Sequence, residues 1–264
     1  MGSMKERAWE KALAQLALDY NAQPENFLSE GNVIVPMAEL PGRRKYREKP
    51  PLFQMATTGQ GVVISAHPSL HQELEQWVGD SQGHRLFEYS KLTELDGILA
   101  PHGWKVSGVF HMFLPKREFT AVSLPRGFSF PWYDGETVKS LYPNRLFPNA
   151  ISERENPLRP DVIAVGAMDR NGLVALAGAS ADGEEMWQVG IDVLPGYRGK
   201  GLGKALVAAL CAGIAQQGKV PFYGTAPANL HSQNIAVGCG FFPAWVEVTT
   251  QPIEEPVEIE GESV

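Results

Sequence analysis

The stretch Asp192-Val-Leu-Pro-Gly-Tyr-Arg-Gly-Lys-Gly-Leu-Gly-Lys204 carries most of what the chain discloses about its fold. An apolar run ends in it and a long apolar segment begins at Leu202, so we expect a strand before the loop and a helix after it. Glycines let a backbone approach a ligand closely, and the N–H groups and dipole of a first helical turn attract anions. The stretch therefore predicts a phosphate-binding loop between a strand and a helix.

Composition limits the other possibilities. The chain has 264 residues, a hydrophobic fraction of 44% and a formal net charge of −7. This acidic balance argues against a nucleic-acid partner, which would need a basic face, and it suits a cationic ligand. No run of about 18 apolar residues and no signal-peptide pattern occurs, so we expect a soluble cytoplasmic protein without a membrane partner. Cys211 and Cys239 lack metal-ligand spacing, so we expect buried free thiols and no metal site.

Hydrophobic periodicity and turn residues predict an alternation of strands and helices. Helices are predicted over residues 5–20, 68–78, 91–100, 135–142, 146–153, 202–217 and 230–239. Strands are predicted over residues 32–38, 52–55, 61–65, 104–114, 119–124, 162–168, 173–179, 186–194, 220–225 and 241–249. A series of hairpins followed by strand–helix–strand units implies an α/β (α+β) fold, with a mixed sheet and helices on both faces.

The spacing of residues around the glycine loop resembles one family. Val193-x-Pro195 precedes Arg198-x-x-Gly201-x-Gly203, which fits the signature Gln/Arg-x-x-Gly-x-Gly/Ala. Asn229-x-x-Ser232 follows 26 residues after Gly203, and Gly240-Phe241 comes eleven residues after Asn229. Over residues 118–250 the chain thus resembles the GCN5-related N-acetyltransferases (GNAT). We expect a GNAT domain there with a mostly antiparallel sheet, a smaller α/β domain over 1–117 and an acidic, disordered tail over 251–264.

The resemblance implies acetyl-CoA as co-substrate and assigns its contacts. The pantetheine arm would pair with the backbone at Ile191, Asp192 and Val193. The pyrophosphate would lie on the loop, whose residues are Arg198, Gly199, Lys200, Gly201, Leu202, Gly203 and Lys204. Asn229 and Ser232 would contact the cofactor nearby.

The usual proton carriers of the family are missing. Alanine (Ala236), glycine (Gly224) and tryptophan (Trp187) stand where its members place a tyrosine or a glutamate. Glu185 shares a strand face with Trp187 and is our candidate base. Tyr223 is an alternative as acid, and catalysis by positioning alone is a third possibility.

The predicted function is transfer of an acetyl group to a primary amine, of a small molecule or a peptide, by direct attack in a ternary complex. A non-catalytic CoA-binding or sensing module is the alternative, and the sequence leaves room for a homodimer. A basic loop, Gly42-Arg-Arg-Lys-Tyr-Arg-Glu-Lys49, is by default a solvated segment. It could instead reach the 3′-phosphate of CoA or an acidic substrate.

Overall fold

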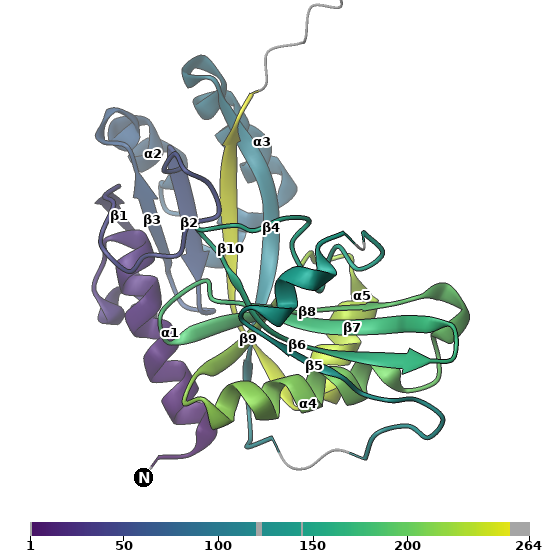
Figure 1. Ribbon diagram of the computed structural model, residues 1–264. Coiled ribbons are helices and arrows are strands. Elements are labelled where there is room, and N and C mark those ends of the chain that lie inside the picture. Colours follow the sequence, from purple (N-terminus) through teal and green to yellow (C-terminus); the bar gives the residue numbers. More distant parts are fainter. Residues whose placement is uncertain (1, 120–122, 144, 254–264) are drawn as a thin grey trace, which may run out of the picture.

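One ten-stranded sheet runs through the whole molecule (Figure 1). The computed structural model describes residues 2–119, 123–143 and 145–253. Within them the strand order is β1-β3-β2-β10-β4-β9-β8-β7-β6-β5. Only the neighbours β1–β3 and β8–β9 are parallel, and the others are antiparallel. The expected mixed, mostly antiparallel sheet is confirmed.

The strands match most of the predicted ranges. They are β1 (Val33–Pro36), β2 (Phe53–Thr57), β3 (Val62–Ala66), β4 (Trp104–Pro115), β5 (Trp132–Asp134), β6 (Asp161–Asp169), β7 (Gly172–Ser180), β8 (Met186–Val193), β9 (Val220–Thr225) and β10 (Phe241–Pro252). A hairpin turn within residues 169–172 joins β6 and β7 as expected, with Arg170 and Asn171 as its loop and Asp169 paired with Gly172. The three-residue strand β5 lacks a periodic pattern of its own and was not predicted.

The N-terminal and C-terminal parts of the sequence share this sheet. β4 lies between β10 and β9, and it pairs with β10 from Phe241↔Pro115 to Pro252↔Trp104. The sheet therefore continues across the predicted boundary at residue 117, and the division into domains stays a prediction. Of the predicted acidic tail, Gln251 and Pro252 end β10, and residues 254–264 lie outside the described residues.

Helices cover both faces of the sheet, as predicted. The α-helices are α1 (Met4–Tyr20), α2 (His71–Val78), α3 (Tyr89–Leu99), α4 (Leu202–Gln216) and α5 (Leu230–Gly238). The short 3₁₀ helices are η1 (Pro24–Leu28), η2 (Pro68–Leu70), η3 (Gly83–Phe87), η4 (Ala100–His102), η5 (Thr137–Leu141) and η6 (Pro195–Tyr197). On β9, Phe222 packs in one core with α1, whereas Tyr223 packs in another with α4. Cys211 and Cys239 are buried and free.

Helix α1 is defined at both ends by its sequence. Ser3 and Glu6 form a capping box at its start, where each side chain accepts a hydrogen bond from the other residue's N–H. The helix ends at Asn21, whose φ of 53° is left-handed. Because Leu16 and Tyr20 are buried against the sheet, α1 ties the start of the chain to β8, β9 and β10.

The helix predicted over residues 146–153 is wrong. This segment forms turns across the sheet, and the N–H groups of Asn149 and Ala150 donate to the Asp192 carboxylate at 2.7 and 3.0 Å. A Cβ on Gly190 would lie 1.8 Å from the Asn149 carbonyl oxygen, so only glycine permits this approach. The helix predicted over 135–142 shrinks to η5. Of the strand predicted over 119–124, residues 120–122 lie outside the described residues.

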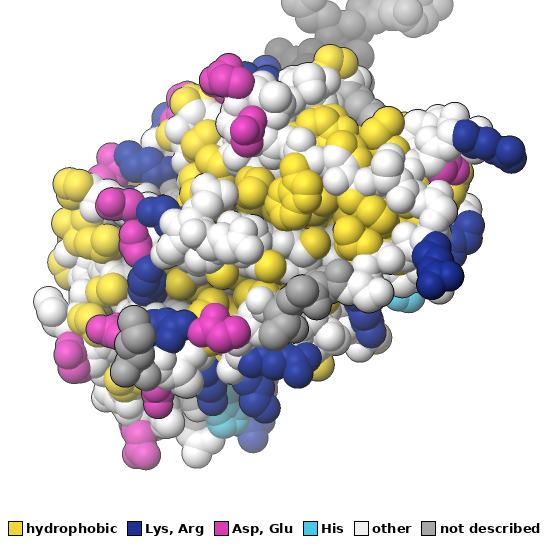
Figure 2. Space-filling model, turned by 60° about the horizontal axis from the view of Figure 1, so that its bottom comes forward, with side chains coloured by type: hydrophobic (Ala, Val, Ile, Leu, Met, Phe, Trp, Pro, Cys, Tyr) yellow, Lys and Arg dark blue, Asp and Glu magenta, His cyan; other side chains and the backbone are white. Residues whose placement is uncertain are grey.

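The face formed by α4 and the neighbouring loops has a mixed surface. Figure 2 shows hydrophobic side chains across this face, between separate groups of acidic and basic side chains. Among the exposed large hydrophobic side chains of the molecule is Trp132, which lies over Gly213 of α4. Within the described residues, no helix combines the length and the apolar character needed to cross a bilayer.

Candidate active site

Strands β8 and β9 separate in the middle of the sheet. Their parallel pairing runs from Met186↔Val220 to Val189↔Tyr223 and stops there. β8 continues to Val193 along β7, and β9 continues to Thr225 along β4. We call the gap that opens beyond Val189 and Tyr223 the splay. It leaves one edge of the β8 backbone from Gly190 onward without a strand partner.

The predicted phosphate loop follows β8 and opens α4. Gly199 and Gly201 have φ values of 76° and 81°, a left-handed conformation that favours glycine. Within the described residues, none of the backbone N–H groups from Gly199 to Lys204 donates to another group of the protein. These free donors lie at the positive end of a fifteen-residue helix. The loop therefore has free donors of the kind that bind anions, and its use as a phosphate site stays a prediction.

Side chains of the loop fix it to its surroundings. The Arg198 Nε donates to the Val193 carbonyl oxygen at 3.1 Å, which fastens the loop to the end of β8. A Cβ on Gly203 would lie 3.3 Å from Ile235 Cδ1, so this glycine brings α4 close to α5. Arg198 thus positions the loop through its side chain.

The remaining predicted cofactor residues meet at the splay. Ile191, Asn229 and Ser232 line a cleft of about 690 Å³ that ends there. The Asn229 side-chain oxygen accepts a hydrogen bond from the Ser232 N–H at 3.1 Å and caps α5. The Asp192 side chain holds Asn149 and Ala150, so only its backbone faces the gap. Leu202 is buried in the core.

Tyr223 is a proton donor that lies beside the splay. It lines the cleft at the last paired position of β9, and its side chain is buried. Burial raises the pKa of the Tyr223 phenol above its ordinary value, so the group stays protonated at neutral pH. A protonated hydroxyl at this place can act as a general acid.

None of the three positions at which the family resemblance leads us to expect a proton carrier has a side chain that can carry a proton. Ala236 and Trp187 are buried in the core beside α4. A Cβ on Gly224 would lie 3.0 Å from the Met112 sulfur and 3.1 Å from the Gln188 Nε2. Larger side chains are thus excluded at Gly224 unless these neighbours move, and Gln188 fills the space instead.

Glu185 lies outside this cleft. It precedes β8 at the end opposite the splay, and its carboxylate pairs with Lys11 and Lys219. The hydrogen bond from Lys11 is the main reason why the pKa of Glu185 is lowered. A carboxylate held between two lysines is a weak base, and this one does not line the cleft. Glu185 lies just outside β8, and the Trp187 side chain, with which we expected it to share a strand face, packs on α4.

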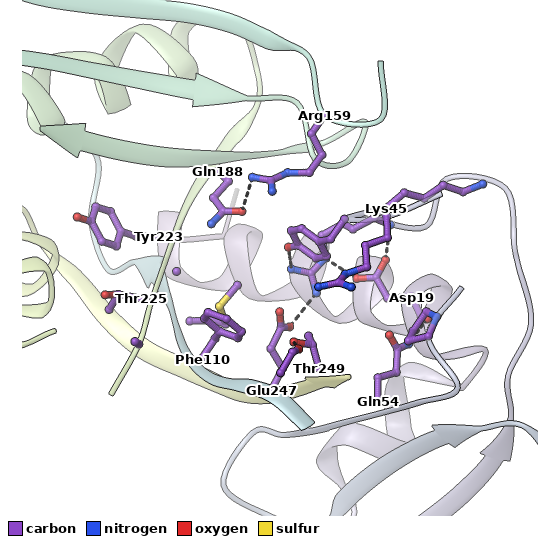
Figure 3. Close-up of a pocket in the computed structure, with 18 of the residues that line it drawn as sticks. Asp19, Lys45, Gln54, Phe110, Arg159, Gln188, Tyr223, Thr225, Glu247 and Thr249 are labelled. Atoms are coloured by element: carbon purple, nitrogen blue, oxygen red, sulfur yellow. Dashed lines mark hydrogen bonds and ion pairs between the residues drawn. The ribbon is translucent and has the colours of Figure 1, made fainter. Parts of the chain in front are cut away.

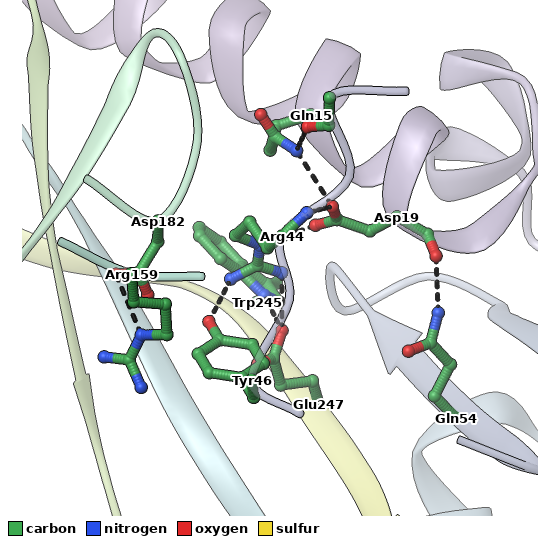
Figure 4. A network of polar contacts seen from close by, with 10 residues as sticks. Gln15, Asp19, Arg44, Tyr46, Gln54, Arg159, Asp182, Trp245 and Glu247 are labelled. Atoms are coloured by element: carbon green, nitrogen blue, oxygen red, sulfur yellow. Dashed lines mark hydrogen bonds and ion pairs between the residues drawn. The ribbon is translucent and has the colours of Figure 1, made fainter. Parts of the chain in front are cut away.

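A buried polar network forms the far wall of the cleft (Figure 4). Arg44 donates through Nε to Asp19 at 2.5 Å and through Nη2 to Glu247 at 3.0 Å. Each of these three side chains is at most 5% exposed. Trp245 Nε1 donates to Glu247 and the Gln15 amide to Asp19. The network joins the basic loop to α1 and β10.

The opposite wall carries two polar residues that the sequence analysis missed (Figure 3). Arg159 donates through Nη2 to Gln188 Oε1 at 3.3 Å and through Nε to Asp182 at 3.1 Å. Arg159 sits in a proline-flanked loop, Pro157-Leu158-Arg159-Pro160, which carries no motif. The alternation of side chains along β8 did indicate where Gln188 lies, because Gln188 has to be on the opposite strand face from Trp187.

Residues 128–241 match the model of the acetyltransferase (GNAT) family. This range includes β8, the glycine loop, α4, β9 and α5, that is, both sides of the splay. The chain therefore contains a GNAT acetyltransferase domain, and this domain belongs to a class of enzymes that transfer acyl groups. No curated protein matches the chain.

Solved structures of the same family are similar to this chain. A GCN5-related N-acetyltransferase-like protein from Streptococcus suis is 14% identical, with 78% of this chain and 87% of that chain covered and a TM-score of 0.46. A GCN5-related N-acetyltransferase from Sphaerobacter thermophilus is 11% identical, with 75% of this chain and 74% of that chain covered and a TM-score of 0.47. A GCN5-related N-acetyltransferase from Kribbella flavida is 17% identical, with 62% of this chain and 65% of that chain covered and a TM-score of 0.44. The chain thus spans slightly less than two thirds of that relative.

Proposed function

We propose that the protein is an acetyl-CoA-dependent N-acetyltransferase that acetylates the amine of a small molecule or a peptide by direct attack in a ternary complex. The observation that carries this proposal is the splay, with a free-donor glycine loop beyond one end and a polar cleft at the other. A donor bound along the splay and an acceptor in the cleft would meet beside Tyr223.

The chain's own groups fit acetyl-CoA. The N–H groups of Gly199 to Lys204 would hold its pyrophosphate, and the unpaired backbone edge at Ile191 to Val193 would pair with its pantetheine arm. The Asn229 amide nitrogen donates to no group in the described part of the chain and is available to the same arm. Acetyl-CoA supplies an acetyl group activated as a thioester.

The groups at the splay and in the cleft define how the reaction would proceed. The amine would attack the carbonyl carbon, so that a C–N bond forms and the C–S bond breaks. Tyr223 would give its hydroxyl proton to the departing thiolate, the amine would release a proton to water, and Tyr223 would regain a proton from water. Every carboxylate that lines the cleft is paired with a cation, namely Asp19 and Glu247 with Arg44 and Glu39 with Lys45.

A covalent acetyl-cysteine route finds no support. Cys211 is fully buried, and burial raises the pKa of its thiol. Burial also raises the pKa of Cys239 to about 11, and this thiol lies against the Lys204 carbonyl oxygen. Protonated, buried thiols are poor nucleophiles, which favours direct attack.

A second candidate is a non-catalytic CoA-binding module. The side chains at Ala236, Gly224 and Trp187 favour it, because none of them can carry a proton. In such a module the splay would bind acetyl-CoA and the cleft would serve only as a sensor surface.

Calorimetry with acetyl-CoA, followed by thiol release with a panel of amines, separates the two candidates. Binding with turnover supports the enzyme, binding without turnover on any amine supports the module, and no binding contradicts both. The variant Arg198→Glu should abolish binding, because it detaches the loop from Val193 and places a negative charge beside the phosphates. Arg170→Glu, the same change in the exposed β6–β7 turn, is the matched control.

A further inference from the structure

The cleft is positively charged although the chain is acidic. Its lining contains six cationic and three acidic side chains: Arg43, Arg44, Lys45, Arg47, Lys49 and Arg159 against Asp19, Glu39 and Glu247. This excess of three positive charges contrasts with the net charge of −7 for the whole chain. Because a cleft focuses the field of its own walls, the local charge decides which ligands it attracts. The expectation of a cationic acceptor, drawn from the net charge, therefore does not describe this cleft.

The three carboxylates are already engaged, and several cations are not. Asp19 and Glu247 both bind Arg44, and Glu39 lies 3.8 Å from Lys45. In the described ranges, no carboxylate lies within 4 Å of the charged groups of the other three cations of the basic loop. These are Arg43, Arg47 and Lys49. A ligand anion would find positive charge there that the protein itself does not neutralise.

Arg43 is buried without full use of its donors. Its side chain lines the cleft, its residue is 8% exposed, and its Nε has no hydrogen-bond partner among the described residues. Its Nη1 lies 3.3 Å from the Ala38 carbonyl oxygen. A buried donor that lacks a partner is costly and therefore rare. An anion in the cleft would supply the missing acceptor.

Arg159 brings a guanidinium close to the edge of the splay. Its Nη2 contacts Gln188, which in turn lies against Gly224 at the edge of the splay. Asp182 and the ring of Tyr46, 4.8 Å from the guanidinium carbon, hold Arg159 in place. Its Nη1 donates to no group in the described part of the chain and remains open for a ligand.

The phosphates of CoA do not account for these cations. The loop from Gly199 to Lys204 does not line the cleft, and Gly201 and Lys204 border a separate hollow. A donor whose pyrophosphate lies on that loop reaches the splay with its thioester end, so its negative charges remain on the other side. The cleft cations are left for the acceptor.

We propose that the acceptor is an amino carboxylate, that is, an amine that also carries a carboxylate group, with its amine at the splay and its carboxylate on Arg159 and Arg43. This inference rests on the proposed function and narrows its substrate class. Guanidinium groups suit it, because they bind carboxylates through two parallel hydrogen bonds. The corresponding carboxamide, in which an uncharged amide replaces the carboxylate, has the same amine but cannot form this ion pair with the guanidinium groups.

Matched pairs of acceptors test the proposal directly. Glycine, β-alanine, 4-aminobutyrate and glycylglycine are each compared with their own carboxamide, by calorimetry on the CoA-loaded protein and by initial rates at equal concentrations of free amine. We expect at least one acid to bind about tenfold or more tightly than its amide and to show a higher kcat/KM. Amides that bind as well as or better than all four acids overturn the proposal, and so does the absence of binding by every acid.

Variants locate the carboxylate. Arg159→Gln is combined with Asp182→Asn, because Asp182 would otherwise be left buried without its cation. We expect the preference for the acid to fall about tenfold, with the amide affected less than twofold. Arg43→Gln, which breaks no ion pair, should lower the same preference several-fold and serves if the double variant fails to fold. Arg85→Gln makes an equal charge change on η3, outside the cleft, and should leave the preference unchanged.

The acetyl-CoA titration keeps the two proposals apart. If wild-type protein does not bind acetyl-CoA, the proposed function fails. If it binds acetyl-CoA but prefers amides, only the assignment of an amino carboxylate fails. A preference for the acid that persists in both arginine variants also overturns this assignment.

Discussion

Arg44 donates to the Glu247 carboxylate at 3.0 Å across 203 positions of sequence, and both side chains are at most 5% exposed. The same guanidinium holds Asp19 of α1, so one buried cation separates two buried carboxylates. Charges in such a place are tolerated only while they are paired. This contact joins the start of the chain, the basic loop and its last strand.

Removal of this cation should be strongly destabilising. Arg44→Met leaves Asp19 and Glu247 facing each other without a counter-charge, and we expect the free energy of unfolding to fall by about 3–5 kcal/mol. Urea denaturation followed by tryptophan fluorescence measures this loss. Arg47→Met, at an exposed arginine of the same loop, should change stability by about 0.5 kcal/mol or less. Equal effects of the two variants would contradict the structural role of Arg44.

Tyr223→Phe should slow turnover without weakening donor binding. The ring still packs against Phe241, but the hydroxyl proton that the thiolate needs is gone. A general acid contributes about 10²–10⁴-fold, so we expect kcat to fall about 100-fold. The Kd of acetyl-CoA should stay within about twofold. A kcat that stays near the wild-type value would remove Tyr223 from the mechanism and leave positioning as the source of catalysis.

Glu185→Gln tests the base that the sequence favoured. Since Glu185 is paired with Lys11 and Lys219 away from the cleft, we expect kcat to change less than about twofold. A base would cost about 100-fold or more. The pKa of Glu185 is lowered in the folded protein, so its small stabilising effect exists above its ordinary value of 4.5 and is lost as the pH falls further. Unfolding of both proteins at pH 7 and at lower pH measures that effect, which we expect to be about 1 kcal/mol at most.

Gly190→Ala should disturb the acceptor cleft through the backbone. The new Cβ would meet the Asn149 carbonyl oxygen at 1.8 Å, and Asn149 lines the cleft. We expect a loss of about 1–3 kcal/mol in stability and a raised KM for the acceptor. Gly196→Ala is the matched control, because an added Cβ there meets nothing within 4 Å. Thermal unfolding and acceptor titrations of both variants provide the comparison.

The sequence predicted the elements that have a strong local pattern. The glycine loop before Leu202 and the hairpin turn at residues 169–172 follow directly from residue types with restricted or special backbone geometry. The segment 146–153 could not be predicted, because its turns depend on Asp192, a residue more than 40 positions away. Local propensity depends on neighbouring residues alone and cannot indicate a contact with such a distant partner.

Of the candidate site, only the glycine loop could be predicted from the sequence. The free N–H groups of the loop are a property of one continuous segment, whereas the cleft is built by side chains such as Arg159, Gln188 and Glu247 from distant elements. The period of β8 separates Trp187 from Gln188. Which of the two faces borders the cleft depends on where α4 packs, and the sequence does not state this.

The place of β4 between β10 and β9 makes the two ends of the chain complementary pieces. A single backbone cut between β4 and β5 would leave β4 paired with β10 along its whole length and with β9 at its end. The two resulting fragments should stay bound to each other and unfold together. Each fragment alone would carry a bare strand edge, which is prone to aggregation. The protein is thus suited to a split reporter, in which only the reassembled halves would show the acetyl-CoA binding that we propose.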